Sequence, residues 1–290
     1  MKKKIIEGSF FTICASLWWG IIGVIYFKFV SFASPIELTI HRTIWTALLL
    51  LITTTYFKKW SEFYIICKSW EKIVLLFLTG ILVSSNWFTW LYSISVNNML
   101  DASFGYYIFP IFSVFLGKIF LNEKINRNKF IAIILVFVSI IYLLIEFKNI
   151  PWIGLIVAIT FSLYSLIRKK IEISSDIGLL FETLLISPIA IILFYNLVIN
   201  NNNVFGLDNP DLSFYLFFAG FMTLVPLFMY TKGFKLIGIG PASMIFFLTP
   251  TAQFFLSIFY LEQTLQVEKL ISFIFIWIAV IIYLNELRKE

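Results

Sequence analysis

Ten apolar segments, each close to twenty residues long, dominate this 290-residue chain. A helix needs about 20 residues to cross the hydrocarbon core of a bilayer, which is roughly 30 Å thick. Hydrophobic residues make up 60% of the chain and charged residues 13%, against about 45–50% and about 25% in soluble proteins. We therefore predict an all-α polytopic membrane protein, and we exclude a soluble enzyme and a disordered chain. The expected spans are residues 8–30, 36–57, 72–94, 101–121, 128–147, 151–168, 177–199, 212–234, 240–261 and 267–286.

The 22 lysines and arginines are distributed unevenly over the predicted connectors. With a cytoplasmic N-terminus, 18 of them lie in cytoplasmic segments, Lys28, Lys148 and Lys269 lie on the opposite side, and Arg42 lies within a span. Cytoplasmic loops of membrane proteins carry such an excess of basic residues. The pattern predicts ten helices with both termini in the cytoplasm. It also assigns the net charge of +6 to orientation in a lipid bilayer rather than to nucleic-acid binding.

The two halves of the chain share an internal repeat. Three matches at an offset of 139 to 141 residues carry it: Ala102-Ser103 with Pro110 against Ala242-Ser243 with Pro250, residues 119–123 against 258–262, and residues 140–143 against 281–284. Five helices per repeat is an odd number, so the second copy must enter the membrane from the opposite side. We predict two inverted five-helix repeats, residues 1–148 and 149–290, forming one membrane domain with a substrate site near its midplane.

Two charged residues are expected at membrane depth, where an uncompensated charge is costly. Arg42 lies about six residues into the second span, and Glu182 lies about five residues into the seventh. Inversion of the repeats would place Arg42 toward the outer side and Glu182 toward the inner side, too far apart for a direct ion pair. They predict a cavity with a cationic outer part and an anionic inner part, or two charges held by neighbouring side chains. His41, the one histidine, shares a helical face with Glu37 and is a candidate for proton coupling or for an interfacial hydrogen bond.

A polar stripe with a proline recurs in the fourth and ninth spans. Tyr106 and Pro110 on the fourth match Phe246 and Pro250 on the ninth, where Gln253 follows at helical spacing. Two prolines at equivalent positions predict two kinked or locally opened helices lining one central cavity, or prolines tolerated for packing alone.

Two further residues are candidates for this cavity. Asn86 on the third span shares a face with Trp90, and its amide could hold a ligand or a neighbouring helix equally well. Trp18 and Trp19 lie midway through the first span rather than at the interface that tryptophan prefers, so one of them is expected to face the cavity.

Taken together and in order, these residues resemble the RarD-type branch of the EamA transporters, within the drug/metabolite transporter superfamily. The resemblance spans nearly the whole chain and is carried by Trp19-Gly20, residues 41–45, Asn86-Trp87, residues 101–106 with Pro110, residues 121–123, residues 168–170, Glu182-Thr183 with Pro188, and residues 225–227. It implies a bacterial inner-membrane protein of ten helices that moves small molecules by alternating access. It also implies that His41, Arg42, Asn86, Tyr106 and Glu182 belong to the central pathway.

We therefore expect a secondary transporter for a small polar or amphiphilic metabolite or a drug-like compound. A zwitterion such as an amino acid or S-adenosylmethionine would match Arg42 and Glu182, with Tyr106, Phe246, Gln253 and Trp19 completing the site. Protons or a counter-substrate are expected as coupling partners. The alternative is a passive channel or a lipid-moving protein. We expect no enzyme, metal or cofactor, because a single histidine excludes a two-histidine zinc site and no nucleotide-binding loop is present.

Overall fold

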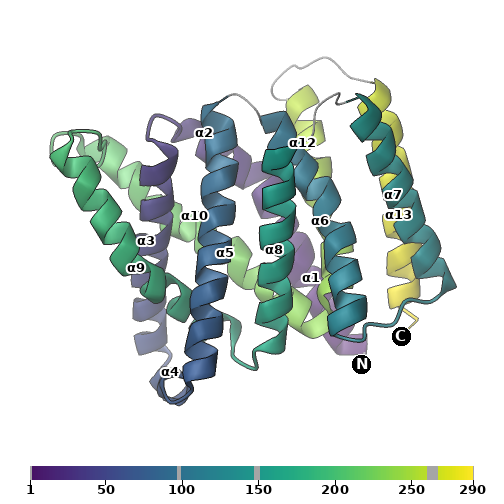
Figure 1. The fold of residues 1–290 in the computed structure, drawn as a ribbon, viewed down its shortest axis with the longest axis horizontal. Helices are drawn as coiled ribbons and strands as arrows, with labels where there is room; N and C mark the ends of the chain where they lie inside the picture. The colour runs from purple at the N-terminus through teal and green to yellow at the C-terminus, as the bar shows by residue number, and fades with distance from the viewer. Residues whose placement is uncertain (1, 97–98, 147–150, 260–266, 290) are drawn as a thin grey trace.

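The computed structural model describes residues 2–96, 99–146, 151–259 and 267–289, which form helices joined by short connectors (Figure 1). No strand occurs in these ranges, so the all-α prediction is confirmed. The elements are α1 (Lys2–Leu17), η1 (Trp18–Gly23), α2 (Val24–Phe29), α3 (Pro35–Tyr56), α4 (Trp60–Cys67), α5 (Trp70–Ser95), α6 (Met99–Phe120), α7 (Arg127–Glu146), α8 (Trp152–Lys170), α9 (Ser175–Ile199), α10 (Pro210–Ile237), α11 (Ile239–Phe246), α12 (Leu248–Phe259) and α13 (Val267–Leu287).

Within the described residues, nine helical stretches are long and apolar enough to cross a membrane. They are the continuous run from α1 to α2, then α3, α5, α7, α8, α9 and α10, the run from α11 into α12, and α13. The apolar part of α6 whose side chains the structure describes, Gly105–Phe120, is shorter than a full span. Each of these helices overlaps one of the ten predicted segments, because bilayer thickness sets their length.

Three details of these helices differ from the simple sequence pattern. The first span contains a π-helical turn, η1, between its two α-helical parts. The ninth is divided at Phe247 into α11 and α12, because Pro250 lies in the first turn of α12, where a missing N–H is tolerated. The short helix α4 follows a lysine with positive φ, Lys58, and was not predicted from hydropathy.

The helices pack in pairs that join distant parts of the sequence. α1 packs on α10, α3 on α9, α6 on α8, and α7 on α13. Both termini and α4 lie at the same end of the bundle (Figure 1). Aromatic side chains, including Phe109, Phe161, Tyr164, Tyr230 and Phe246, are buried at the centre between these pairs.

Some predictions concern residues outside the described part of the chain. The expected repeat boundary at residues 148 and 149 and the repeat match at Glu262 lie there. The side chains of Ala102 and Ser103 are also outside the described set.

Candidate functional site

The π-helical turn in the first span places Trp19 at the centre of the molecule. A π-turn widens the helix locally and is frequent at functional sites. Gly20 allows η1 to approach α12, because a Cβ at this position would lie 2.8 Å from Ala252 Cβ and 2.9 Å from the Thr249 carbonyl oxygen. The Trp19 ring then lies with its centroid 6.0 Å from that of Phe161 and 5.6 Å from that of Phe246.

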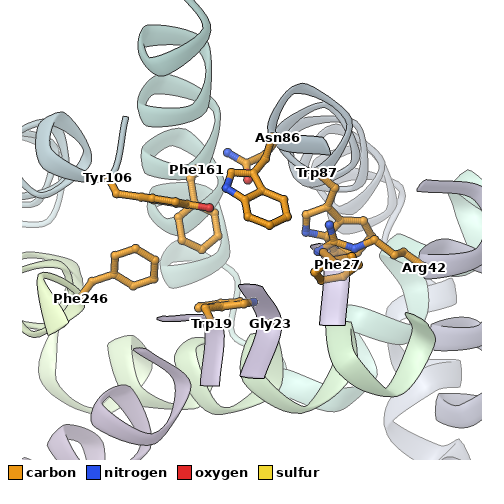
Figure 2. A pocket seen from close by; sticks show the side chains of 10 residues that line it. Trp19, Gly23, Phe27, Arg42, Asn86, Trp87, Tyr106, Phe161 and Phe246 are labelled. Atoms are coloured by element: carbon orange, nitrogen blue, oxygen red, sulfur yellow. The ribbon is translucent and has the colours of Figure 1, made fainter. Parts of the chain in front are cut away.

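Trp19 forms part of the wall of a central cavity with a volume of about 40 Å³, room for a few water molecules. Figure 2 shows the side chains around it. They come from η1, α2, α3, α5 and α6 in the first half of the chain and from α8 and α11 in the second half. The lining residues are Trp19, Gly23, Phe27, Arg42, Asn86, Trp87, Trp90, Tyr106, Phe161 and Phe246.

Arg42 is the one charged residue in this lining, and its side chain is 4% exposed. Its Nε donates a hydrogen bond of 2.9 Å to Thr223 Oγ1 on α10. The guanidinium carbon lies 4.6 Å from the ring centroids of both Phe27 and Trp87. Within the part of the chain that the structure describes, no carboxylate pairs with Arg42. Ring faces attract a cation but do not carry a counter-charge, so the guanidinium of Arg42 is chemically able to bind an anion.

Besides the indole N–H groups of Trp19, Trp87 and Trp90, the other polar side-chain groups of the cavity lining are an amide and a phenol. Asn86 Nδ2 donates to the Val157 carbonyl at 2.9 Å and to Thr160 Oγ1 at 3.1 Å, which joins α5 to α8. Tyr106 lies with Phe246 at the end of the cavity opposite Arg42 (Figure 2), their ring centroids 5.7 Å apart. The cavity thus has a cationic end and an aromatic end.

His41 lies on a different face of α3 from Arg42 and does not line the cavity. Its Nδ1 accepts a hydrogen bond of 3.1 Å from Trp45 Nε1, and its Nε2 lies 3.8 Å from Glu37 Oε1. Glu37 Oε1 in turn accepts the backbone N–H groups of Val204 and Phe205, both at 2.8 Å. The structure therefore places His41 in a cluster that holds the connector before α10 against α3.

Glu182 lies in a second buried cluster, separate from the cavity lining. Its Oε1 is 3.0 Å from Arg168 Nε and accepts a hydrogen bond of 2.7 Å from Thr79 Oγ1, while its Oε2 accepts from the Tyr164 hydroxyl at 3.4 Å. The side chains of Arg168 and Glu182 are 0% and 1% exposed. Arg168 packs against Gly178, where any Cβ would overlap its guanidinium. Both oxygens of Glu182 are thus engaged within the protein.

Of the eight predicted site residues, the structure brings five together in the cavity: Trp19, Arg42, Asn86, Tyr106 and Phe246. Gln253 is half-buried on α12, beyond the break at Phe247, and does not line it. The lining residues that the sequence analysis did not name as candidates are four aromatic residues and one glycine. In the sequence they cannot be told apart from residues that face lipid or pack between helices. Trp90, however, could have been predicted from the sequence, because it lies one turn after Asn86 on the same helical face.

Glu123 joins the two halves of the chain, although the sequence analysis named it only within the segments 119–123 and 121–123. It lies in the connector after α6, where its two carboxylate oxygens accept the backbone N–H groups of Ile239 and Gly240 at 2.7 and 3.0 Å. These donors begin α11, and an anion at a helix N-terminus is stabilised by the helix dipole. Burial raises the pKa of Glu123, although the two N–H donors and nearby Lys169 oppose the shift. The sequence feature that could have identified Glu123 is its place in the repeated segment 119–123.

Comparison with known proteins gives a family match to the first half of the chain and relatives that cover nearly all of it. The model of the "EamA-like transporter family" matches residues 6–145. Protein RarD of Salmonella typhi is 30% identical over 98% of this chain and 96% of its own length. An uncharacterized transporter of Vibrio cholerae is 31% identical over 96% and 91%, and the uncharacterized transporter YojE of Bacillus subtilis is 30% identical over 96% and 93%.

A crystal structure supports the fold independently. It superposes with a TM-score of 0.72 at 13% identity, covering 99% of this chain and 100% of that one, which is evidence for a shared fold alone. With relatives of at least 30% identity over nearly full length, the chain belongs to the EamA transporter family, in its RarD-type branch, and is a multi-pass membrane transporter.

Proposed function

We propose that this chain is a secondary carrier that moves a small polar or amphiphilic metabolite across the bacterial inner membrane by alternating access. The observation that carries the proposal is Arg42, a buried cation with no carboxylate partner among the described residues, in a cavity lined by both halves of the chain. An ionisable residue at membrane depth is costly and marks a substrate or ion pathway. Carriers built from repeats bind substrate between the repeats near the bilayer midplane.

The proposed architecture is ten helices in two inverted repeats, residues 1–148 and 149–290. Here α6 is the tenth span. In chain order, the run α1–α2 corresponds to α8, α3 to α9 and α5 to α10. In the same way, α6 corresponds to the run α11–α12, and α7 to α13. A two-fold relation requires that contacts occur in equivalent pairs. Two such pairs support it: α1 on α10 with α8 on α5, and α6 on α8 with α11 and α12 on α1 and η1. The self-equivalent contacts α3–α9 and α7–α13 also occur.

The proposed orientation has both termini in the cytoplasm. The two ends of the chain and α4 share one end of the bundle (Figure 1). The same end carries basic residues, including Lys58, Lys59 and Lys68 around α4, as cytoplasmic segments do.

Polar bonds join the two halves at this proposed cytoplasmic end. Glu123 in the first half binds the N-terminus of α11 in the second. Lys59 Nζ lies 2.5 Å from Asp176 Oδ2, and Thr79 donates to Glu182. Opening the cavity to the cytoplasm would break these bonds. In the proposed cycle, the structure is a state that is closed at the cytoplasmic end and has a small cavity. The cavity must widen and open to admit substrate.

The test is counterflow into proteoliposomes containing the purified protein. Labelled amino acids, S-adenosylmethionine and aromatic carboxylates are supplied outside, with or without an excess of the same unlabelled compound inside. A carrier predicts saturable uptake that the internal compound accelerates, and an imposed proton gradient separates proton coupling from exchange. Flux that rises linearly with concentration and shows no counterflow would contradict the carrier and support the alternative, a passive channel or lipid-moving protein.

A further inference from the structure

We propose that the central cavity selects organic anions in which a carboxylate is joined to an aromatic ring by a short linker, in preference to zwitterions and cations of the same size. This inference rests on the proposed carrier function and narrows its substrate class. It follows from the charges that line the cavity, from the engagement of Glu182 elsewhere, and from the distribution of aromatic rings around Arg42.

The described lining contains one cation and no carboxylate. Arg42 is the single charged residue among the ten lining residues. Glu182, the anion expected from the sequence, is held by Arg168, Thr79 and Tyr164. Asn86 has its amide N–H group bonded to Val157 and Thr160, so it offers a carbonyl oxygen but no charge. A substrate ammonium would therefore find no counter-ion in this cavity.

Arg42 has unused capacity for one anionic group. Its Nε is bonded to Thr223, and Phe27 and Trp87 cover the guanidinium with their rings. A guanidinium carries five N–H donors and binds a carboxylate through two parallel hydrogen bonds. In an amino acid, the α-ammonium is held within a few ångströms of the carboxylate, and thus of the guanidinium. The like charges would repel each other in a region with little water to screen them.

The rest of the cavity favours a flat ring. Seven of the ten lining residues are aromatic: Trp19, Phe27, Trp87, Trp90, Tyr106, Phe161 and Phe246. Trp19, Tyr106 and Phe161 each lie within 6.0 Å of Phe246 or of one another, centroid to centroid. This is the range in which aromatic rings attract each other in offset or edge-to-face arrangements. When the cavity opens to admit a substrate, a ring among these side chains would lie opposite Arg42 (Figure 2), so a carboxylate on a short linker would point toward the guanidinium.

Four compounds with one ring and one linker test the proposal. Hydrocinnamate is the anion, phenylalanine is the same molecule with an α-ammonium, hydrocinnamide replaces the carboxylate by a neutral amide, and phenethylamine is a cation. Dissociation constants are measured by calorimetry on the purified full-length protein in detergent. A charge-assisted hydrogen bond contributes about 1.5–3 kcal/mol, so hydrocinnamate is expected to bind at least about tenfold more tightly than the other three.

Variants separate the role of the charge from a general loss of structure. Arg42→Ala should weaken hydrocinnamate at least about tenfold while leaving hydrocinnamide nearly unchanged. Arg127→Ala at the exposed start of α7 is the matched control and should bind all four compounds as the wild type does. A size-exclusion profile and a thermal melt establish that each variant is folded.

The outcomes distinguish this inference from the carrier proposal. Phenylalanine or phenethylamine binding as tightly as hydrocinnamate, or no binding of hydrocinnamate by folded wild type, would overturn the anion assignment, whatever the counterflow assay shows. Selective binding of hydrocinnamate that is lost in Arg42→Ala supports the assignment even if proteoliposomes show no counterflow. In that case the carrier function alone would fail.

Discussion

The surroundings of the two buried arginines, Arg168 and Arg42, lead us to expect opposite changes in the free energy of unfolding when each site loses a charge. Arg168 is paired with Glu182 at 3.0 Å, and both side chains are essentially inaccessible. Arg42 is almost as buried but is bonded to a hydroxyl and covered by two rings. Removing one partner of a buried ion pair leaves a buried charge without compensation, at a cost of about 3–5 kcal/mol. Glu182→Gln should therefore lower the free energy of unfolding by about that amount.

Arg42→Met should behave differently because it removes an uncompensated buried cation. The variant loses one hydrogen bond, worth about 1 kcal/mol, and two cation–π contacts, worth about 0.5–2 kcal/mol each. It also no longer pays the desolvation of a guanidinium, which is several kcal/mol. We expect the free energy of unfolding to be unchanged or raised, while anion binding is lost. Such a conflict between stability and activity is typical of binding sites.

Equilibrium unfolding in mixed detergent micelles, followed by circular dichroism, measures both effects. The double variant Arg168→Met with Glu182→Leu is the control for the ion pair, since removing both charges should restore most of the stability lost in Glu182→Gln. The reasoning would be refuted if Glu182→Gln unfolded within about 0.5 kcal/mol of wild type, the range of ordinary surface substitutions. It would also be refuted if Arg42→Met were the less stable of the two.

Three further predictions concern residues outside the cavity wall. Gly178→Ala should displace the Arg168 guanidinium, because the added Cβ would overlap it, and should lower the detergent melting temperature as Glu182→Gln does. Gly20→Ala should separate η1 from α12 and reduce the maximal counterflow rate more than it reduces expression, since its Cβ would lie 2.8 Å from Ala252 Cβ. Burial raises the pKa of Glu123 in the folded state, so the folded protein binds this proton more tightly than the unfolded chain. The contribution of Glu123 to the free energy of unfolding is then complete below the ordinary glutamate pKa, and it declines as pH rises through the raised pKa. Glu123→Gln should remove that part of the pH dependence in a series of melts.

The spans could be predicted from the sequence because bilayer thickness imposes one length on all of them. The interruptions could not be located so well. Pro250 indicated a break in the ninth span, but Pro110 lies within the continuous α6. Nothing in residues 18–23 distinguishes a π-turn from an α-helix. The turn depends on how closely η1 approaches α12, which is a tertiary contact.

The candidate site was predictable where a polar residue had no structural reason to be at membrane depth. Arg42 and Asn86 are such residues, and both line the cavity. The family resemblance assigned both His41 and Arg42 to the central pathway, but consecutive residues point in directions about 100° apart on a helix, and only Arg42 lines the cavity. The Glu182 partner, Arg168, was interpreted as an orientation signal because it begins a basic cluster. Its burial depends on Gly178, which allows the guanidinium to lie against α9.

Counterflow of a labelled aromatic carboxylate tests the central claim most directly. A sulfonate analogue, whose permanent charge prevents leakage across the bilayer, is measured in parallel. Proteoliposomes are prepared in three matched sets, with wild-type protein, Arg42→Ala and Arg127→Ala at equal protein density. The account predicts saturable counterflow in wild type and Arg127→Ala and its loss in folded Arg42→Ala. Equal counterflow in all three sets would contradict it, because transport would then not depend on the one cation in the cavity lining.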